Sequence, residues 1–97
     1  MSSPIITGTQ ARSLIEGAQA QIVDVRTADE FNRGAVPGAR NIPLSILPLQ
    51  ATQLDRNRPV VVYCLSGGRS AQARMLLLGM GFDSVHNLGS LQHYMNT

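Results

Sequence analysis

The chain has 97 residues, of which 43% are apolar and 14% are charged, with one cysteine and a formal net charge of +2. This length and composition fit one globular domain with its own core, and they exclude a disordered chain. A single cysteine cannot form an intramolecular disulfide, which favours a reducing compartment.

The charge and the apolar runs limit the possible partners. All eight basic residues are arginines spread along the chain, so no basic run indicates a nucleic-acid interface. The first ten residues lack the positive and apolar segments of a signal peptide. No apolar run approaches the roughly 20 residues that span a bilayer. We therefore expect a single cytoplasmic domain over residues 1–97, with no nucleic-acid partner and no membrane partner.

The first half of the chain alternates apolar runs with helical segments. In chain order we expect a strand over 5–7, a helix to about Gly17 capped by Thr7 or Thr9, a strand over 21–25, a helix over 28–33 ended by Gly34, and a brief strand around Asn41 within a turn-rich segment.

The second half continues the alternation. In chain order we expect a weak helix over 45–54 with Pro48 in its first turn, a strand over 60–63, a helix over 68–78, a short strand over 84–86 and a helix over 91–95. The run 60–63 is apolar throughout, as is typical of a central parallel strand buried on both faces. The pattern predicts an α/β domain whose mostly parallel sheet has helices on both faces.

The cysteine lies at a position where such sheets carry their sites. Ligands bind outside the carboxyl ends of parallel strands, and Cys64 follows the run 60–63 directly. It begins the segment CLSGGRS, which leads into the helix expected from Gly68. The amide groups at the start of that helix and the charge of Arg69 favour a thiolate over a thiol.

The rest of the segment can bind an anion. Gly67 and Gly68 leave their amides unobstructed and permit a curled backbone, which makes an anion-binding nest. Ser66 and Ser70 add hydroxyl donors. A lone cysteine is more often a buried apolar residue than a nucleophile, but this combination favours a reactive thiolate in an anion cradle.

Four segments resemble the single-domain rhodanese sulfurtransferases, and they occur in that family's order. They are IVDVR at 22–26, Glu30-Phe31, GARNIPL at 38–44 and CLSGGRS at 64–70. The resemblance implies a rhodanese-like domain of three layers, with a five-stranded, mostly parallel sheet. It also implies that Cys64 is the catalytic nucleophile, that residues Leu65, Ser66, Gly67, Gly68, Arg69 and Ser70 bind the substrate, and that Asp24 and Arg26 frame the pocket, with Arg26 paired to Glu30.

The reaction that the resemblance implies is transfer of a sulfane sulfur through a persulfide on Cys64. The partners are a small anionic sulfur donor, such as thiosulfate, and a thiol or protein acceptor, with cyanide as the acceptor in an assay. No cofactor or metal is implied. His86 and His93, seven residues apart, do not form a recognisable metal site and are expected to be ordinary surface or cap residues.

Three other functions remain open from the sequence. A persulfide carrier that serves a partner protein uses the same chemistry at Cys64. A cysteine-based phosphatase or arsenate reductase is disfavoured, because those enzymes have five residues between cysteine and arginine and this loop has four. A non-catalytic interaction module is disfavoured because the cysteine and its whole loop are present.

Overall fold

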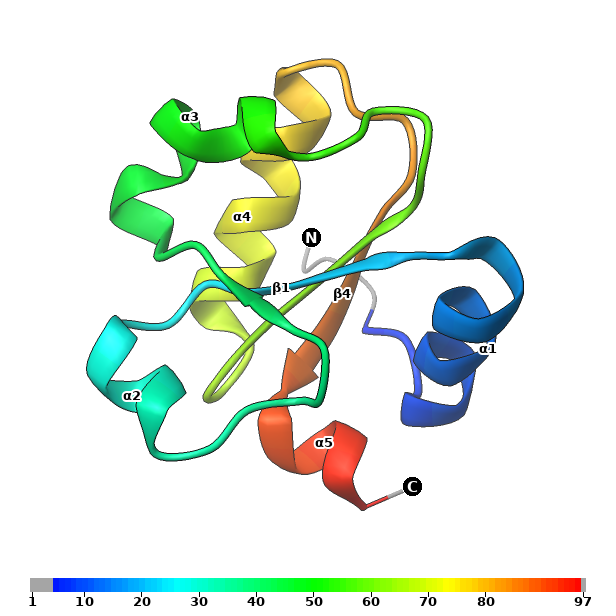
Figure 1. The fold of residues 1–97 in the computed structure, drawn as a ribbon, viewed down its shortest axis with the longest axis vertical. Coiled ribbons are helices and arrows are strands. Elements are labelled where there is room, and N and C mark those ends of the chain that lie inside the picture. Colours follow the sequence, from blue (N-terminus) through cyan, green and yellow to red (C-terminus); the bar gives the residue numbers. More distant parts are fainter. Residues whose placement is uncertain (1–4, 97) are drawn as a thin grey trace.

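The computed structural model describes residues 5–96 of the chain (Figure 1). Over these residues the chain forms one sheet of four parallel strands in the order β2-β1-β3-β4. The strands are β1 (Gln21–Asp24), β2 (Arg40–Asn41), β3 (Val60–Cys64) and β4 (Val85–Ser90). The helices are α1 (Gly8–Ala18), α2 (Ala28–Asn32), α3 (Leu47–Gln50), α4 (Gly68–Gly79) and α5 (Leu91–Met95), and 3-10 turns Leu44–Ile46 and Ala51–Gln53 flank α3. The predicted α/β class is confirmed.

The expected first strand is the main difference in the sheet. Residues 5–7 make a single parallel bridge, Ile5 to Asn87, and Ile6 N–H donates to Asn87 O at 2.9 Å. The pairing stops there because Thr7 leaves the sheet to cap α1 through a capping box with Gln10. The sheet of the described residues therefore has four strands where five were expected.

Helices cover both faces of the sheet (Figure 1). The strand β3 is buried along its whole length, and its alternate side chains enter two different cores. Val60, Val62 and Cys64 join the core under α3 and α4. Val61 and Tyr63 join the core under α1 and α5. Cys64 therefore ends the central strand with its side chain on the α3/α4 face.

The last strand is longer than predicted and is irregular. It runs over Val85–Ser90, and the register against β3 shifts at one point, so that Val62 pairs with Asn87 and Tyr63 with Gly89. Asn87 is buried, and its Oδ1 accepts the Gly89 N–H at 2.9 Å. Asparagine and glycine are rare in strands, so the low strand propensity of Asn87 and Gly89 led us to end the predicted strand at residue 86. This irregular turn of backbone lies beside the Cys64 loop.

Candidate active site

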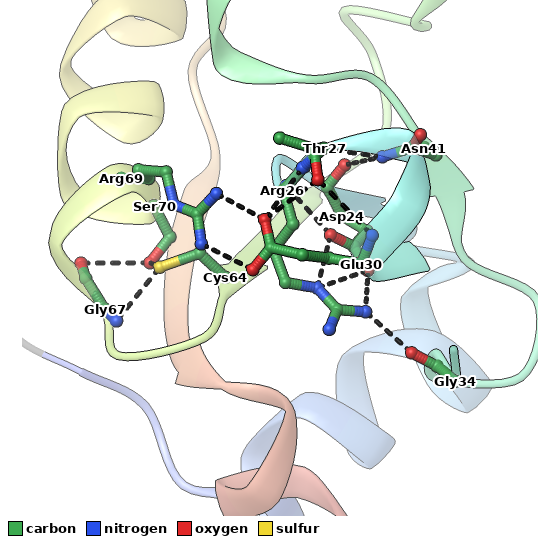
Figure 2. Close-up of polar contacts among 10 residues, drawn as sticks. All are labelled: Asp24, Arg26, Thr27, Glu30, Gly34, Asn41, Cys64, Gly67, Arg69 and Ser70. Carbon is green, nitrogen blue, oxygen red and sulfur yellow. Dashed lines mark hydrogen bonds and ion pairs between the residues drawn. The ribbon is translucent and has the colours of Figure 1, made fainter. Parts of the chain in front are cut away.

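The loop from Cys64 to Ser70 joins β3 to α4 and curls around the thiol (Figure 2). Gly67 is the residue before α4, with a φ of 101°, a conformation that L side chains rarely adopt. This turn aims the Gly67 N–H at Cys64 Sγ, which it reaches at 3.0 Å. Of the two glycines predicted to form the nest, Gly67 therefore takes the positive φ and donates to sulfur.

Ser70 lies in α4 beside the sulfur and is fully buried. The thiol faces Ser70 Oγ at 3.5 Å, and that hydroxyl lies 3.1 Å from the carbonyl of Gly67 and 3.4 Å from that of Gly89. When Cys64 is a thiolate, the same hydroxyl can rotate and donate to sulfur. The β4 irregularity thus contributes a carbonyl that positions this serine.

Cys64 itself has no exposed surface. Burial raises the pKa of its thiol, but hydrogen bonds from the Ser70 hydroxyl and from the amides of Ser70, Gly67 and Ser66 outweigh burial, and the pKa lies below its ordinary value. A lowered pKa increases the fraction of thiolate, which is the nucleophile. The loop can therefore stabilise negative charge on sulfur without an adjacent base.

The outer side of the loop is exposed to solvent at Leu65, Ser66 and Gly68. Arg69 is partly exposed. Leu65 is 61% exposed, although the preceding residue, Cys64, is buried. Ser66 borders a cleft of about 340 Å³ that Gly89 and His93 also line. The loop thus combines a buried sulfur with an accessible outer rim.

Arg69 pairs with a residue that the sequence did not assign to it. Its Nη1 and Nη2 donate to Glu30 Oε1 and Oε2 at 2.7 and 3.0 Å (Figure 2). The expected pair of Arg26 with Glu30 is wrong, because Arg26 is occupied elsewhere. Glu30 is held by a capping box at the start of α2, where its Oε1 also accepts the Thr27 N–H at 3.1 Å. The spacing of Thr27 and Glu30 is the sequence signal for this capping box.

Asp24 and Arg26 form a buried ion pair on the opposite face of the sheet from Cys64. The Asp24 carboxylate accepts from Arg26 Nη2 at 2.6 Å and from Arg26 Nε at 2.9 and 3.0 Å. Arg26 Nη2 also donates to Gly34 O at 2.7 Å, and Arg26 lies over the Tyr63 ring at 5.7 Å. The Asn41 amide donates to the carbonyls of both residues at 3.0 Å. This network fixes the turn that carries Glu30.

The two histidines take part in separate local contacts. His86 Nε2 lies 2.9 Å from Ser84 Oγ, and burial lowers the pKa of its imidazole. His93 Nε2 lies 3.1 Å from Ile6 O. Within residues 5–96, no three His, Cys, Asp or Glu side chains come together in a way that could hold a metal ion. No helix in that same range is long and apolar enough to cross a membrane.

The fold and the loop together define a class of protein: a parallel α/β domain with a buried cysteine thiol that a backbone amide contacts at a strand-to-helix junction. Comparison with known families assigns the chain within that class. Residues 7–96 match the rhodanese-like domain. The chain belongs to the rhodanese family.

Individual relatives agree with this assignment. The chain is 33% identical over 88 residues to a protein named sulfurtransferase from Allochromatium vinosum, covering 91% of this chain and 82% of the relative. It is 38% identical over 79 residues to thiosulfate sulfurtransferase GlpE of Shewanella oneidensis, covering 81% and 78%. A solved structure of a human single-domain sulfurtransferase superposes with a TM-score of 0.83 and 27% identity, covering 98% of this chain and 97% of that chain. All three relatives are named sulfurtransferases, and the match covers 78% to 97% of each relative's length.

Proposed function

We propose that this protein is a sulfurtransferase that carries a sulfane sulfur as a persulfide on Cys64. The observation that carries the proposal is the environment of the sulfur, where the Gly67 N–H lies at 3.0 Å and the Ser70 hydroxyl at 3.5 Å. Donors placed in this way stabilise charge on sulfur before and after transfer. The thiosulfate sulfurtransferase among the relatives supports the same reaction.

The reaction proceeds in two displacements at sulfur. The Cys64 thiolate attacks the outer sulfur of the donor, a new sulfur–sulfur bond forms, and the donor's own sulfur–sulfur bond breaks. With thiosulfate the leaving group is sulfite, which departs with the electron pair. A second nucleophile then takes the outer sulfur and returns Cys64 as a thiolate. Each displacement breaks one sulfur–sulfur bond and forms one bond to the transferred sulfur, which is sulfur–sulfur with a thiol acceptor and sulfur–carbon with cyanide, so no outside oxidant or reductant is needed.

The amides of residues 65–69 receive the persulfide, and the Ser70 hydroxyl contacts the Cys64 sulfur. Asp24 and Arg26 act on the site indirectly, because they hold the turn that carries Glu30 toward Arg69. Because Cys64 has no exposed surface, we expect the loop or the Arg69 side chain to shift when a donor enters.

A persulfide carrier is the second candidate. The chain contains one cysteine, so no internal thiol can resolve the persulfide, and the sulfur must leave to an external acceptor. Leu65, 61% exposed beside Cys64, offers an apolar contact for a protein acceptor. A reducing compartment such as the cytoplasm, where protein thiols stay reduced, is the setting we propose.

Intact-mass spectrometry tests the proposal. The reduced protein is mixed with thiosulfate beside a Cys64→Ser control. We expect the wild type alone to gain one sulfur atom, and cyanide to remove it as thiocyanate. If thiosulfate and organic sulfane donors all leave the mass unchanged while Cys64 is reduced, the proposal is wrong, and phosphatase and binding assays follow.

A further inference from the structure

The single charged residue of the Cys64 loop is already paired before any substrate enters. Both terminal nitrogens of Arg69 donate to the two oxygens of Glu30, at 2.7 and 3.0 Å. This bidentate pair occupies the same guanidinium N–H groups with which an arginine would otherwise bind a sulfonate or phosphate. The loop cation is therefore neutralised toward an incoming anion.

Glu30 stays ionised under all ordinary conditions. The hydrogen bond from Arg69 and those from Thr27 lower the pKa of its carboxyl to about 2. An anion that approaches Arg69 therefore meets a carboxylate at the same place. The repulsion scales with the charge of the donor, so it is twice as large for a dianion as for a monoanion at the same distance.

A cleft beside Arg69 suits an uncharged portion of a donor. It has a volume of about 290 Å³, and its walls are mostly apolar, being formed by Val25, Thr27, Pro43, Leu44, Ser45 and Arg69. Thiosulfate is small and charged throughout, so it leaves such a cleft empty. A donor with an apolar body gains buried surface there.

We propose that Glu30 is a specificity-determining residue that disfavours dianionic sulfur donors and favours monoanionic donors whose apolar body lies in the cleft beside Arg69. Aryl thiosulfonates have this chemistry. This inference rests on the sulfurtransferase function proposed above. The Cys64 thiolate attacks the outer sulfur, the bond between the two donor sulfurs breaks, and a sulfinate monoanion leaves with the electron pair. Thiosulfate instead releases the sulfite dianion beside Glu30.

The test compares thiosulfate with benzenethiosulfonate as donors, with cyanide as the acceptor, at low ionic strength. The Glu30→Gln variant keeps an oxygen at the third position of α2, so the capping box with Thr27 survives while the charge is lost. We expect the KM for thiosulfate to fall by roughly tenfold and the KM for benzenethiosulfonate by only about threefold, since the Coulomb energy follows the donor charge. The Asp29→Asn control removes a charge from the same helix without touching Arg69.

A set of charge variants separates this effect from mere repositioning of the loop. Glu30→Gln leaves the pair with a net positive charge, Arg69→Gln leaves it negative, and the double variant returns it to neutral. The KM ratio of thiosulfate to benzenethiosulfonate should be lowest in the first, highest in the second, and close to wild type in the double variant. A structural role for Glu30 would instead lower kcat for both donors alike.

The cleft is tested by Leu44→Ala, with Leu49→Ala as the matched control, because Leu49 is 81% exposed and does not line the cleft. We expect Leu44→Ala to raise the KM for benzenethiosulfonate severalfold and to leave that for thiosulfate unchanged, with urea unfolding confirming that the variant folds. An equal change for both donors would overturn the placement of the apolar body.

Two failures can be told apart. Sulfur transfer from both donors with a KM ratio that Glu30→Gln does not change would overturn this inference and leave the proposed function standing. A wild-type protein that takes sulfur from neither donor would overturn both.

Discussion

Among substitutions that remove a single charge, we expect Asp24→Asn to lower the free energy of unfolding most. The Asp24 side chain is fully buried, and the Arg26 side chain is only 5% exposed. The carboxylate accepts the Arg26 backbone N–H at 2.9 Å as well as the guanidinium contacts. Asparagine keeps one oxygen but turns an amide N–H₂ toward the guanidinium. The arginine is then a buried charge without a counterion.

Removing one partner of a buried pair costs about 3–5 kcal/mol. A domain of this size has a free energy of unfolding of about 5–15 kcal/mol, so the loss is a large fraction of the total. Each kcal/mol moves the Tm of a domain of 60–100 residues by roughly 4–8 °C, which predicts a fall of about 12 °C or more.

Urea unfolding followed by far-ultraviolet circular dichroism measures the loss, because the chain has no tryptophan for fluorescence. Asp29→Asn is the control, since Asp29 is exposed in the first turn of α2 and should cost below about 1 kcal/mol. Replacing the whole pair, Asp24→Leu with Arg26→Met, should recover at least half of the loss, because no unpaired charge remains. A cost below about 1 kcal/mol for Asp24→Asn would refute the view that this pair stabilises the turn carrying Glu30.

Three further predictions concern the loop and its supports. Ser70→Ala removes the hydroxyl that helps to lower the pKa of Cys64, so the pH profile of alkylation by iodoacetamide should move to higher pH. Glu30 has a lowered pKa in the folded protein, so its ion pair should contribute up to about 1 kcal/mol to the free energy of unfolding above pH 4.5. That contribution should be lost as the pH falls through about 2. Gly89→Ala places a Cβ 3.2 Å from Ile5 Cγ2 at a φ of 89°, and it should cost roughly 1–2 kcal/mol or more in urea unfolding.

Each of these predictions has a matched control. Ser66 acts on Cys64 through its backbone, so Ser66→Ala should leave the alkylation profile in place. The Glu30→Gln variant should lose the acid dependence assigned to Glu30, and an unchanged dependence would contradict the assignment. Gly17 lies in α1, where an alanine Cβ would have no neighbouring atom within 4 Å, so Gly17→Ala should stabilise the protein by about 0.5–1 kcal/mol. Equal effects at Gly17 and Gly89 would contradict the steric argument.

Most of the fold could be predicted because its elements follow local rules. The helix at α5 has the bounds expected for it, and the helices at α1 and α4 differ from expectation by about one residue. The strand β3 is recognisable because four consecutive apolar residues suit a central strand. The β4 extension could not be predicted, since Asn87 and Gly89 join the sheet by pairing with Val62 and Tyr63 of β3. Propensity carries no information about such a contact.

The site could be predicted in its residue types but only partly in its pairings. Gly67 and Ser70 contact Cys64 from within the same loop, so sequence spacing reveals their roles. The partner of Arg69 lies 39 positions away in the chain, on a different helix. Arg26 and Arg69 were both within the family resemblance, and nothing local decided which of them pairs with Glu30. Burial decided it, because Arg26 forms its ion pair with the buried Asp24 at the end of β1.

The alternation along β3 explains how the two halves of the site are connected. Tyr63 and Cys64 are neighbours in sequence, but they face opposite sides of the sheet. Tyr63 packs with the Asp24–Arg26 pair, and its hydroxyl accepts the Val36 N–H at 3.0 Å. Cys64 faces the loop and α4. The buried network therefore cannot touch the thiol, and its route to the site runs through the turn that carries Glu30 to Arg69. For that reason, substitutions at Asp24 should alter donor preference only when they displace Glu30.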